Sequence, residues 1–275
     1  MQPRGVLHHP LAARRVTVVG TRQVGGGLLR VTLRGPELDG FSALGPTDHI
    51  KLFLPDPATG VLHAPWITDD GGLQRPDHGV SISRDYTPLN HVPATANGEA
   101  SIDIDCVLHK NPGPATRWAA QAAPGQEVVV VGPRGSVLAP TATPHVVLIA
   151  DETALPAVSR WLELLDPETR ITAILQGEDE SVEDYLTPNQ HARAAIEWLY
   201  REDGPGQVYE AVRSLTLDDS TYVWAAGEAT ELIPVRRHLR RELGFELDQM
   251  SVQGYWKRGV VNLDHHAPID ESDPE

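Results

Sequence analysis

The sequence predicts a β-barrel plus α/β architecture, in which an antiparallel barrel or sandwich precedes a domain with a parallel sheet. In the first half, short apolar or alternating runs are separated by Gly- and Pro-containing turns, the pattern of an all-β domain. In the second half, apolar strands alternate with helical segments, the pattern of a parallel sheet covered by helices on both faces. The Pro-containing stretch 140–144 reads as a linker, so we expect domains at residues 1–140 and 141–275.

The strands of the first half are short and end at turn residues. The glycines at 25–27 make the first turn, and Ile102 and Ile104 alternate with Asp103 and Asp105 along a later strand. This alternation predicts one buried and one polar face. We expect the strands within residues 14–34 (a pair), 49–55, 80–86, 99–109 and 127–132, with a polar insertion at 55–79.

The second half begins with a continuous apolar strand of the kind found inside parallel sheets. Its last helix carries Arg and His in its later turns and is followed by Gly244, which predicts where that helix stops. Residues 177–191 read as an acidic loop with one helical turn at 181–186. We expect strands at 145–150, 169–176, 195–200, 221–226 and 250–256, and helices at 157–165, 207–215 and 229–243.

Composition excludes several classes of function. The formal net charge of −15 argues against nucleic acid or an anionic membrane as the main partner, because both bind basic surfaces. The single cysteine, Cys106, excludes an internal disulfide and any cysteine-based metal site. No apolar run is long enough for a membrane span or a signal peptide, so we expect a cytoplasmic protein. The histidines are scattered, with His8 and His9 in an N-terminus expected to be flexible, and we expect no metal site.

The tetrapeptide Arg84-Asp85-Tyr86-Thr87 combines a cation, an aromatic face and a hydroxyl. A guanidinium suits a phosphate, a Tyr ring offers a flat surface to a heterocycle, and a Thr hydroxyl reaches a ring nitrogen. In an extended segment Arg84 and Tyr86 share one face. These residues read as a flavin nucleotide site; the alternative is an exposed Arg, a half-buried Tyr and a turn-forming Thr-Pro.

A short helix is expected to begin at Gly113-Pro114, since Pro favours the first helical position. The free N–H groups and the positive dipole end of such a helix suit a pyrophosphate. The alternative is a plain crossover helix whose first position is proline.

The turn after the first parallel strand lacks the glycine fingerprint of dinucleotide-binding folds. It reads Ala150-Asp151-Glu152-Thr153, which is acidic where a pyrophosphate usually meets glycines. The turn at 226–229 lies after another parallel strand, at the end of the sheet where open α/β folds bind ligands. Its alternative interpretation is a tight strand-to-helix turn.

Six motifs in one order carry a family resemblance. They are Arg84 to Thr87, Val107 to His109 with Gly113 to Ala115, Gly132 to Ser136, Asp151 to Ala157, Val223 to Glu228 and Gly254 to Lys257. Together, over about residues 14–259, they resemble the siderophore-interacting protein family of FAD-dependent ferric-siderophore reductases, within the ferredoxin reductase-like flavoproteins. The resemblance implies a cytoplasmic enzyme with an FAD-binding barrel and a nucleotide-binding-like α/β domain. It implies electrons from NADH or NADPH, or from a ferredoxin, and a ferric siderophore as substrate; we also expect a monomer.

Carried over residue by residue, the resemblance implies roles in cofactor binding and catalysis. Arg84 is expected to face flavin phosphate, and Tyr86 and Thr87 are expected to be catalytic, with Tyr86 on the isoalloxazine ring and Thr87 at its N5 edge. Thr153 and Asp151 are expected near the flavin from the second domain. The expected cofactor-binding residues are Arg84, Asp85, Tyr86, Thr87, Asp105, Val107, His109, Gly113, Pro114, Ala115, Thr116, Asp151, Thr153, Ala154, Gly227, Glu228 and Trp256.

An acidic chain needs local cations to attract an anionic ferric complex. The expected substrate-binding residues are Lys51, Arg134, Lys257 and Arg258, each of which has solvated surface charge as its alternative. Pro88-Leu89 stands where members of this family often have a basic residue, which leaves the identity of the siderophore open. Two other functions stay open here: a flavoprotein that passes electrons to a protein acceptor, and a siderophore-binding protein without turnover.

Overall fold

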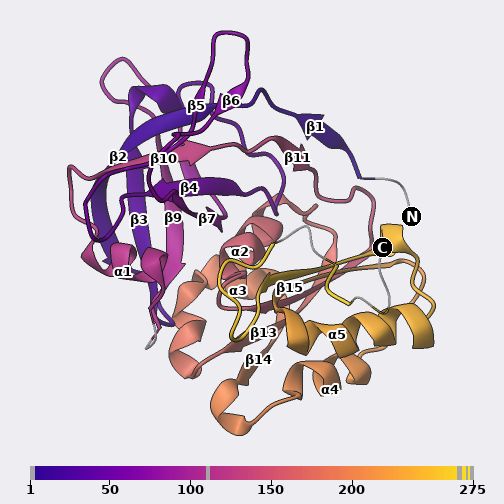
Figure 1. Cartoon of the computed structure of the whole chain (residues 1–275). Coiled ribbons are helices and arrows are strands. Elements are labelled where there is room, and N and C mark those ends of the chain that lie inside the picture. Colours follow the sequence, from indigo (N-terminus) through magenta and orange to yellow (C-terminus); the bar gives the residue numbers. More distant parts are fainter. Residues whose placement is uncertain (1–3, 110–111, 265–267, 271, 273–275) are drawn as a thin grey trace. The chain divides into compact units, whose positions relative to one another are not determined.

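A computed structural model describes residues 4–109, 112–264, 268–270 and 272. The chain divides into two compact units: Gly5–Leu138 forms the barrel unit, and the α/β unit starts at Ala139 and includes the N-terminal Arg4 (Figure 1). The fold class predicted from the sequence is therefore confirmed. Among the described residues, no helix is both long and apolar enough to cross a membrane.

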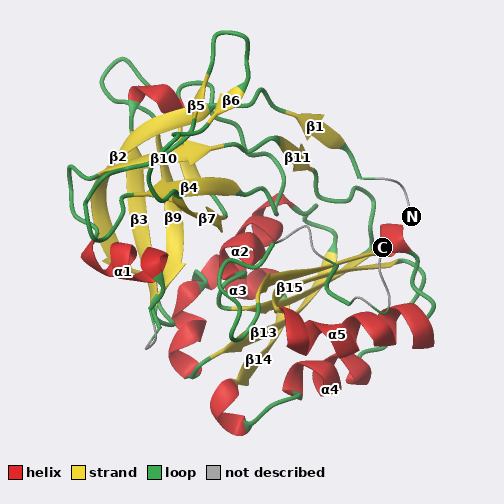
Figure 2. Ribbon diagram, viewed as in Figure 1, coloured by secondary structure: helices red, strands yellow, loops and turns green. Residues whose placement is uncertain are grey.

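The barrel unit is built on a seven-stranded antiparallel sheet that curls around an apolar core (Figure 2). The strands follow the spatial order β7-β4-β10-β2-β3-β9-β8. Their bounds are β2 (Ala13–Gln23), β3 (Leu28–Arg34), β4 (Ile50–Leu54), β7 (Ile82–Tyr86), β8 (Leu89–Val92), β9 (Ser101–Val107) and β10 (Glu127–Val131), and a 3₁₀ turn spans Pro36–Leu38. The alternation predicted for β9 holds, since Ile102 and Ile104 are fully buried.

One helix and two small sheets complete this unit. Helix α1 (Pro114–Gln121) buries Ala115, Trp118 and Ala119 in the barrel core. The prediction of a flexible N-terminus is wrong, because β1 (Val6–His8) pairs with β11 (Gly135–Val137). The insertion at 55–79 contains a short hairpin of β5 (Trp66–Ile67) and β6 (Leu73–Gln74).

The α/β unit contains a five-stranded parallel sheet in the order β14-β13-β12-β15-β16. The strands are β12 (His145–Asp151), β13 (Arg170–Gly177), β14 (Ala195–Tyr200), β15 (Thr221–Glu228) and β16 (Met250–Trp256). The helices are α2 (Leu155–Leu164), α3 (Pro188–Arg193), α4 (Gln207–Ser214) and α5 (Ala229–Arg237), with 3₁₀ turns at Glu180–Tyr185, Arg201–Asp203 and Leu247–Gln249.

Alternate side chains of β15 separate the two helical layers. Trp224 contacts Trp161 of α2, whereas Val223 and Ala225 join the core formed with α4 and α5. The segment expected as a helix over 229–243 is helical from Ala229 to Glu242, with Pro234 inside α5. The chain continues from His238 to Glu242 as a π-helical turn.

Candidate functional site

Strand β7 places Arg84 and Tyr86 on the inner face of the barrel sheet. In the register with β4, Arg84 lies opposite Leu52 and Tyr86 lies opposite Ile50, both of which are fully buried. The half-buried Tyr86 packs against the barrel core, and burial, followed by its hydrogen-bonded neighbour Cys106, raises the pKa of its hydroxyl. Arg84 Nη1 donates to the Ser83 carbonyl (2.6 Å). The two side chains predicted for a flavin therefore share the face that the sequence pattern predicted.

The outer face of β7 carries an ion pair. Asp85 lies opposite Lys51 in the register, and Lys51 Nζ is 2.7 Å from Asp85 Oδ1. The Lys51 side chain is 40% exposed, so this pair stabilises the fold little. One residue expected to bind the cofactor and one expected to bind the substrate are thus paired with each other. Thr87, the next residue on the same side as Asp85 in an extended chain, is buried.

Helix α1 begins with unshielded backbone N–H groups. Gly113 is extended (φ −73°, ψ 178°), Pro114 starts the helix, and no side chain among the described residues caps it. The N–H groups of Ala115 and Thr116 belong to the first turn, which has no acceptor within the helix. The Thr116 hydroxyl lies 3.1 Å from His109 Nε2. Helix α1 packs beside β7, β9 and β3, so the predicted pyrophosphate-binding start lies on the element that neighbours Arg84 and Tyr86.

Asp105 is engaged inside the barrel sheet. Both its carboxylate oxygens accept from Arg30, at 2.7 Å from Nε and 2.6 Å from Nη2. Arg30 lies directly opposite Asp105 in the β3–β9 register, and Val107 lies opposite Leu28 at the end of the same pairing. A bidentate pair of this kind fixes the two strands in place. Arg30 was missed from the sequence, although it lies on the same strand face as Thr32.

The carboxyl edge of the parallel sheet is organised around the buried carboxylate of Asp151. Oδ1 accepts from the backbone N–H and the hydroxyl of Thr153 (2.9 and 2.5 Å). Oδ2 accepts from the Glu228 N–H (3.0 Å) and from the indole nitrogen of Trp256 (2.7 Å). One carboxylate therefore joins the turn after β12, the end of β15 and the end of β16. Ala154 follows in the same turn and is fully buried.

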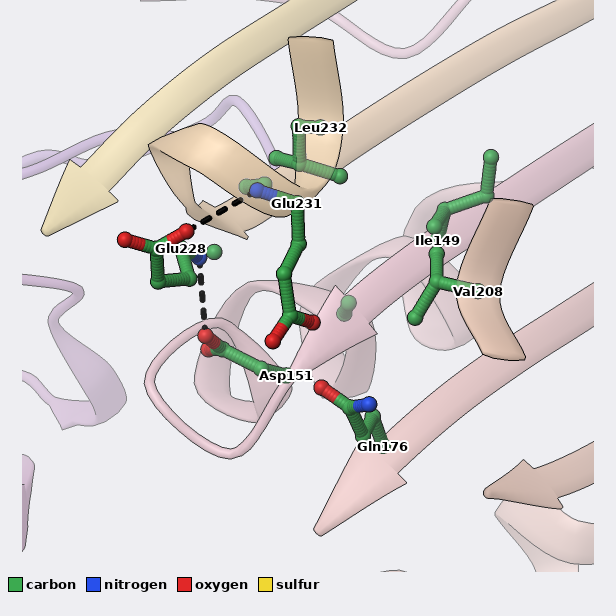
Figure 3. A pocket seen from close by; sticks show the side chains of 10 residues that line it. Ile149, Asp151, Gln176, Val208, Glu228, Glu231 and Leu232 are labelled. Carbon is green, nitrogen blue, oxygen red and sulfur yellow. Dashed lines mark hydrogen bonds between the residues drawn. The ribbon is translucent and has the colours of Figure 1, made fainter. Parts of the chain in front are cut away.

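Gly227 permits this arrangement. Its φ of +152° is one that side chains rarely adopt, and a Cβ there would lie 2.8 Å from Asp151 Cγ. The next residue, Glu228, accepts from the N–H groups of Glu231 (2.9 Å) and Arg258 (3.0 Å). Figure 3 shows the small pocket at this edge, where Asp151, Glu231 and Gln176 come together. Gln176 and Glu231 were missed, because only the assembled sheet brings them to Asp151.

Electrostatics at this edge are dominated by acids. Burial raises the pKa of Asp151 to about 6, and the nearby Glu152 adds to this, while hydrogen bonds from Thr153 and Trp256 oppose it. Arg201 Nη1 lies 2.5 Å from Glu152 Oε1. Arg201 was also missed; it follows β14 and reaches the acidic turn after β12 across the intervening β13. Arg201 is therefore already paired within the edge.

The expected substrate-binding cations are on turns or strand ends. Arg134 follows β10, whose residue Val131 lies opposite Lys51. Arg134 is exposed, and so are Lys257 and Arg258 in the α/β unit. The turn at 257–260 is closed by a hydrogen bond from the Val260 N–H to the Lys257 carbonyl.

Comparison with known proteins identifies both units. Residues 17–137 match the siderophore-interacting FAD-binding domain, and residues 143–259 match the siderophore-interacting protein domain. The NADPH-dependent ferric-chelate reductase of Escherichia coli is 30% identical over 91% of this chain and 95% of that protein. The ferric vibriobactin reductase of Vibrio cholerae is 31% identical over 94% and 96%.

Solved structures agree with these matches. A siderophore utilization protein from T. fusca is 39% identical, with a TM-score of 0.84 over 96% of this chain and 100% of that one. The FAD/NAD-binding domain of a Vibrio cholerae nitric oxide dioxygenase is 14% identical with a TM-score of 0.65, over 88% and 99%, and so shares the fold. The resemblance and the FAD-binding barrel predicted from the sequence are confirmed: the chain belongs to the siderophore-interacting protein family.

Proposed function

We propose that this protein is an FAD-dependent reductase that releases iron as Fe(II) from a ferric siderophore. The observation that carries the proposal is the grouping of Arg84 and Tyr86 on the inner face of β7, beside a helix whose first turn is uncapped. The relatives from E. coli and V. cholerae, both named as ferric reductases, bear out the prediction of this activity.

The residues of the barrel unit fit FAD by their chemistry. The N–H groups of Ala115 and Thr116, at the positive end of α1, suit the pyrophosphate. Arg84 offers a guanidinium to a phosphate oxygen, and Tyr86 offers a ring face to the isoalloxazine. The hydrogen bond between Thr116 and His109 holds both side chains at the same end of α1. Asp105, which is paired with Arg30, acts on this site by fixing two strands, whereas Asp85 forms the more exposed pair with Lys51.

Bound FAD would supply the conversion between two-electron hydride donation and the one-electron reduction of Fe(III). The chain's part is to hold, orient and shield the reacting groups. Tyr86 is held by its packing against the barrel core, and the buried Thr87 restricts access of water beside it. Fe(II) binds hard oxygen donors more weakly than Fe(III), so the reduced iron leaves its chelator, and no protein ligand to iron is required.

The donor site belongs to the α/β unit in this proposal, with residues 1–140 carrying FAD and 141–275 carrying the donor. Ligands of open α/β sheets bind at the carboxyl ends of the strands, where Asp151, Thr153, Gly227 and Glu228 lie. The E. coli relative is named as NADPH-dependent, which supports NADPH. NADH and a ferredoxin stay alternative predictions.

Substrate selection is proposed to depend on Lys51, Arg134, Lys257 and Arg258. The net charge of −15 repels an anionic ferric complex at long range, so attraction must be local. Of the four, Lys51 is paired with Asp85, which reduces its contribution. We expect the protein to act as a monomer, which sedimentation at working concentration tests.

The test is an anaerobic assay of purified protein with its bound flavin. We expect a yellow protein whose absorbance bleaches with NADPH and returns on addition of a ferric chelate, while a ferrous chelator reports Fe(II). Bleaching without reoxidation by any ferric chelate favours a reductase for a protein acceptor. Protein that binds ferric chelate but no FAD is a siderophore-binding protein, and either result contradicts the proposal.

A further inference from the structure

A buried polar network in the barrel unit has no role in the proposed flavin site. It joins Asp48, Ser136 and His9, which come from three separate segments. Ser136 has no exposed surface and Asp48 is 4% exposed. The Ser136 hydroxyl donates to Asp48 Oδ2 at 2.5 Å, and His9 Nε2 lies 2.8 Å from the same hydroxyl oxygen.

The hydrogen positions of this network follow from counting. Ser136 has one hydroxyl hydrogen, which Asp48 accepts, so His9 Nε2 must carry the hydrogen that it shares with Ser136. The Leu44 N–H also donates to Ser136 (3.0 Å), and the Gly45 N–H donates to Asp48 (2.9 Å). The network is satisfied at every one of these groups. It is not a hydrolytic triad, because the carboxylate contacts the serine and not the imidazole, and the serine is inaccessible.

The network holds the segment that carries Arg134. The backbone N–H of His9 donates to the Arg134 carbonyl (2.9 Å), and the Arg14 guanidinium donates to the Gly132 carbonyl (3.1 Å). Ser136 lies two residues beyond Arg134 and is fixed by the network and by its pairing opposite Leu7. The backbone on both sides of Arg134 is therefore held. Its guanidinium is exposed and makes no hydrogen bond or ion pair with any residue that the structure describes.

Burying a carboxylate such as that of Asp48 is costly unless it is well paired. An arginine that is only a solvated surface charge would not need a backbone fixed by such a buried group. We propose that the Asp48–Ser136–His9 network is a positioning device for Arg134, which binds the anionic groups of a ferric chelate. The device lets the reductase favour ferric complexes that carry catecholate or carboxylate charge over neutral ones. This inference rests on the proposed reductase function.

His9 is the residue to change, because it is only partly buried and its loss leaves Ser136 bonded to Asp48. His9→Ala removes the donor to Ser136, whereas His9→Gln places an amide N–H near the same position. His8→Ala is the matched control, since exposed His8 pairs with Gly135 through its backbone in β1. Arg134→Gln removes the proposed anion-binding group itself.

The measurement is steady-state reduction of a ferric tricatecholate and of a neutral ferric trihydroxamate by the holoenzyme. We expect His9→Ala to raise KM for the tricatecholate about fivefold, the loss of one hydrogen bond, with kcat unchanged. KM for the trihydroxamate and FAD content should not change. His9→Gln should bring KM for the tricatecholate most of the way back to the parent value, and His8→Ala should behave as the parent.

A double-mutant cycle decides whether His9 acts through Arg134. We expect His9→Ala to have no further effect on KM in the Arg134→Gln background. Equal effects on both substrates, or additive effects of the two changes, would overturn the positioning role. Failure of the parent to reduce either complex would instead contradict the proposed function, so the two failures are distinguishable.

Discussion

The two units differ in whether the hydrogen-bond donors at their candidate binding sites are already bonded within the protein. In the barrel unit, no described side chain caps the first turn of α1, so the N–H groups of Ala115 and Thr116 are available to an anion. In the α/β unit, the donors at the carboxyl edge of the sheet are directed at the unit's own carboxylates, chiefly Asp151 and Glu228. The barrel leaves donors for an external anionic group, whereas at the α/β edge the unit's own carboxylates already occupy the donors.

We propose that this difference decides which ligand each unit holds tightly. A pyrophosphate on α1 meets donors for which no side chain in the described part of the chain competes. A dinucleotide phosphate at the α/β edge meets Asp151, Glu152 and Glu228, and Arg201, a cation of this edge, is paired with Glu152. The contrast fits a resident FAD in the barrel and a weakly held, exchangeable electron donor at the edge.

The largest effect is expected at Gly227, the residue that allows Asp151 to approach the end of β15. Gly227→Ala places a Cβ 2.8 Å from Asp151 Cγ, in a backbone conformation with φ +152°. We expect it to destabilise the protein by about 2–4 kcal/mol, because both strain and the broken network contribute. Urea unfolding followed by circular dichroism measures this. Gly259→Ala is the control for φ alone, since Gly259 has φ +80° and open space around its Cβ position.

If the two glycine variants lose the same stability, the close approach to Asp151 contributes nothing, and the α/β edge is not closed in the way described.

The barrel side of the comparison is tested at Tyr86. Tyr86→Ala should weaken FAD binding by roughly 1–3 kcal/mol, the value of a stacked ring, and should shift the visible spectrum of the flavin. Tyr86→Phe keeps the ring and loses only the hydroxyl near Cys106, so it should retain FAD. Titration of the apoprotein with FAD measures both. FAD retention and a spectrum equal to those of the parent in Tyr86→Ala would remove the ring from the site.

A smaller effect is expected when the guanidinium of Arg84 is replaced by a side chain of the same charge but a different shape. Arg84→Lys should weaken FAD binding by about 1 kcal/mol, because an ammonium cannot bind two phosphate oxygens as a guanidinium does. The same titration applies, with Arg22→Lys, on an exposed part of β2, as the control. Equal affinity in Arg84→Lys and the parent would show that Arg84 is not a bidentate phosphate ligand.

A test of a different kind concerns the pH dependence of stability at the α/β edge. The pKa of Asp151 is raised to about 6 by burial and by Glu152, above its unfolded value of about 3.9. The folded state then binds more protons between these two values, so stability from this group is present below pH ~4 and is lost as pH rises to about 6. The hydrogen bonds from Thr153 and Trp256 oppose the shift and limit its size.

We subtract the unfolding free energy of Asp151→Asn from that of the parent at each pH from 4 to 7. This difference should fall with pH and level off above pH 6. A difference that rises with pH would mean that the donors around Asp151 outweigh its burial.

Much of the barrel could be predicted because its signals are local. Alternation put Arg84 and Tyr86 on one face of a strand, and Gly113-Pro114 marked the start of α1. The resulting grouping needed only neighbouring elements.

What could not be predicted depends on distant segments. The pairing of β1 with β11 joins residues about 130 positions apart through three-residue strands, which are too short for a periodic signal. The Asp151 network depends on β12 lying next to β15 and β15 next to β16.

Single-turnover reduction of iron tests the central claim most directly. The holoenzyme is reduced anaerobically with one equivalent of NADPH, mixed with a ferric chelate, and followed by flavin absorbance and by Fe(II) trapped with a ferrous chelator. Because each reduced flavin carries two electrons, the account predicts two Fe(II) for each FAD, formed as the flavin absorbance returns. Flavin that stays reduced in the presence of ferric chelate, with no Fe(II) formed, would contradict it.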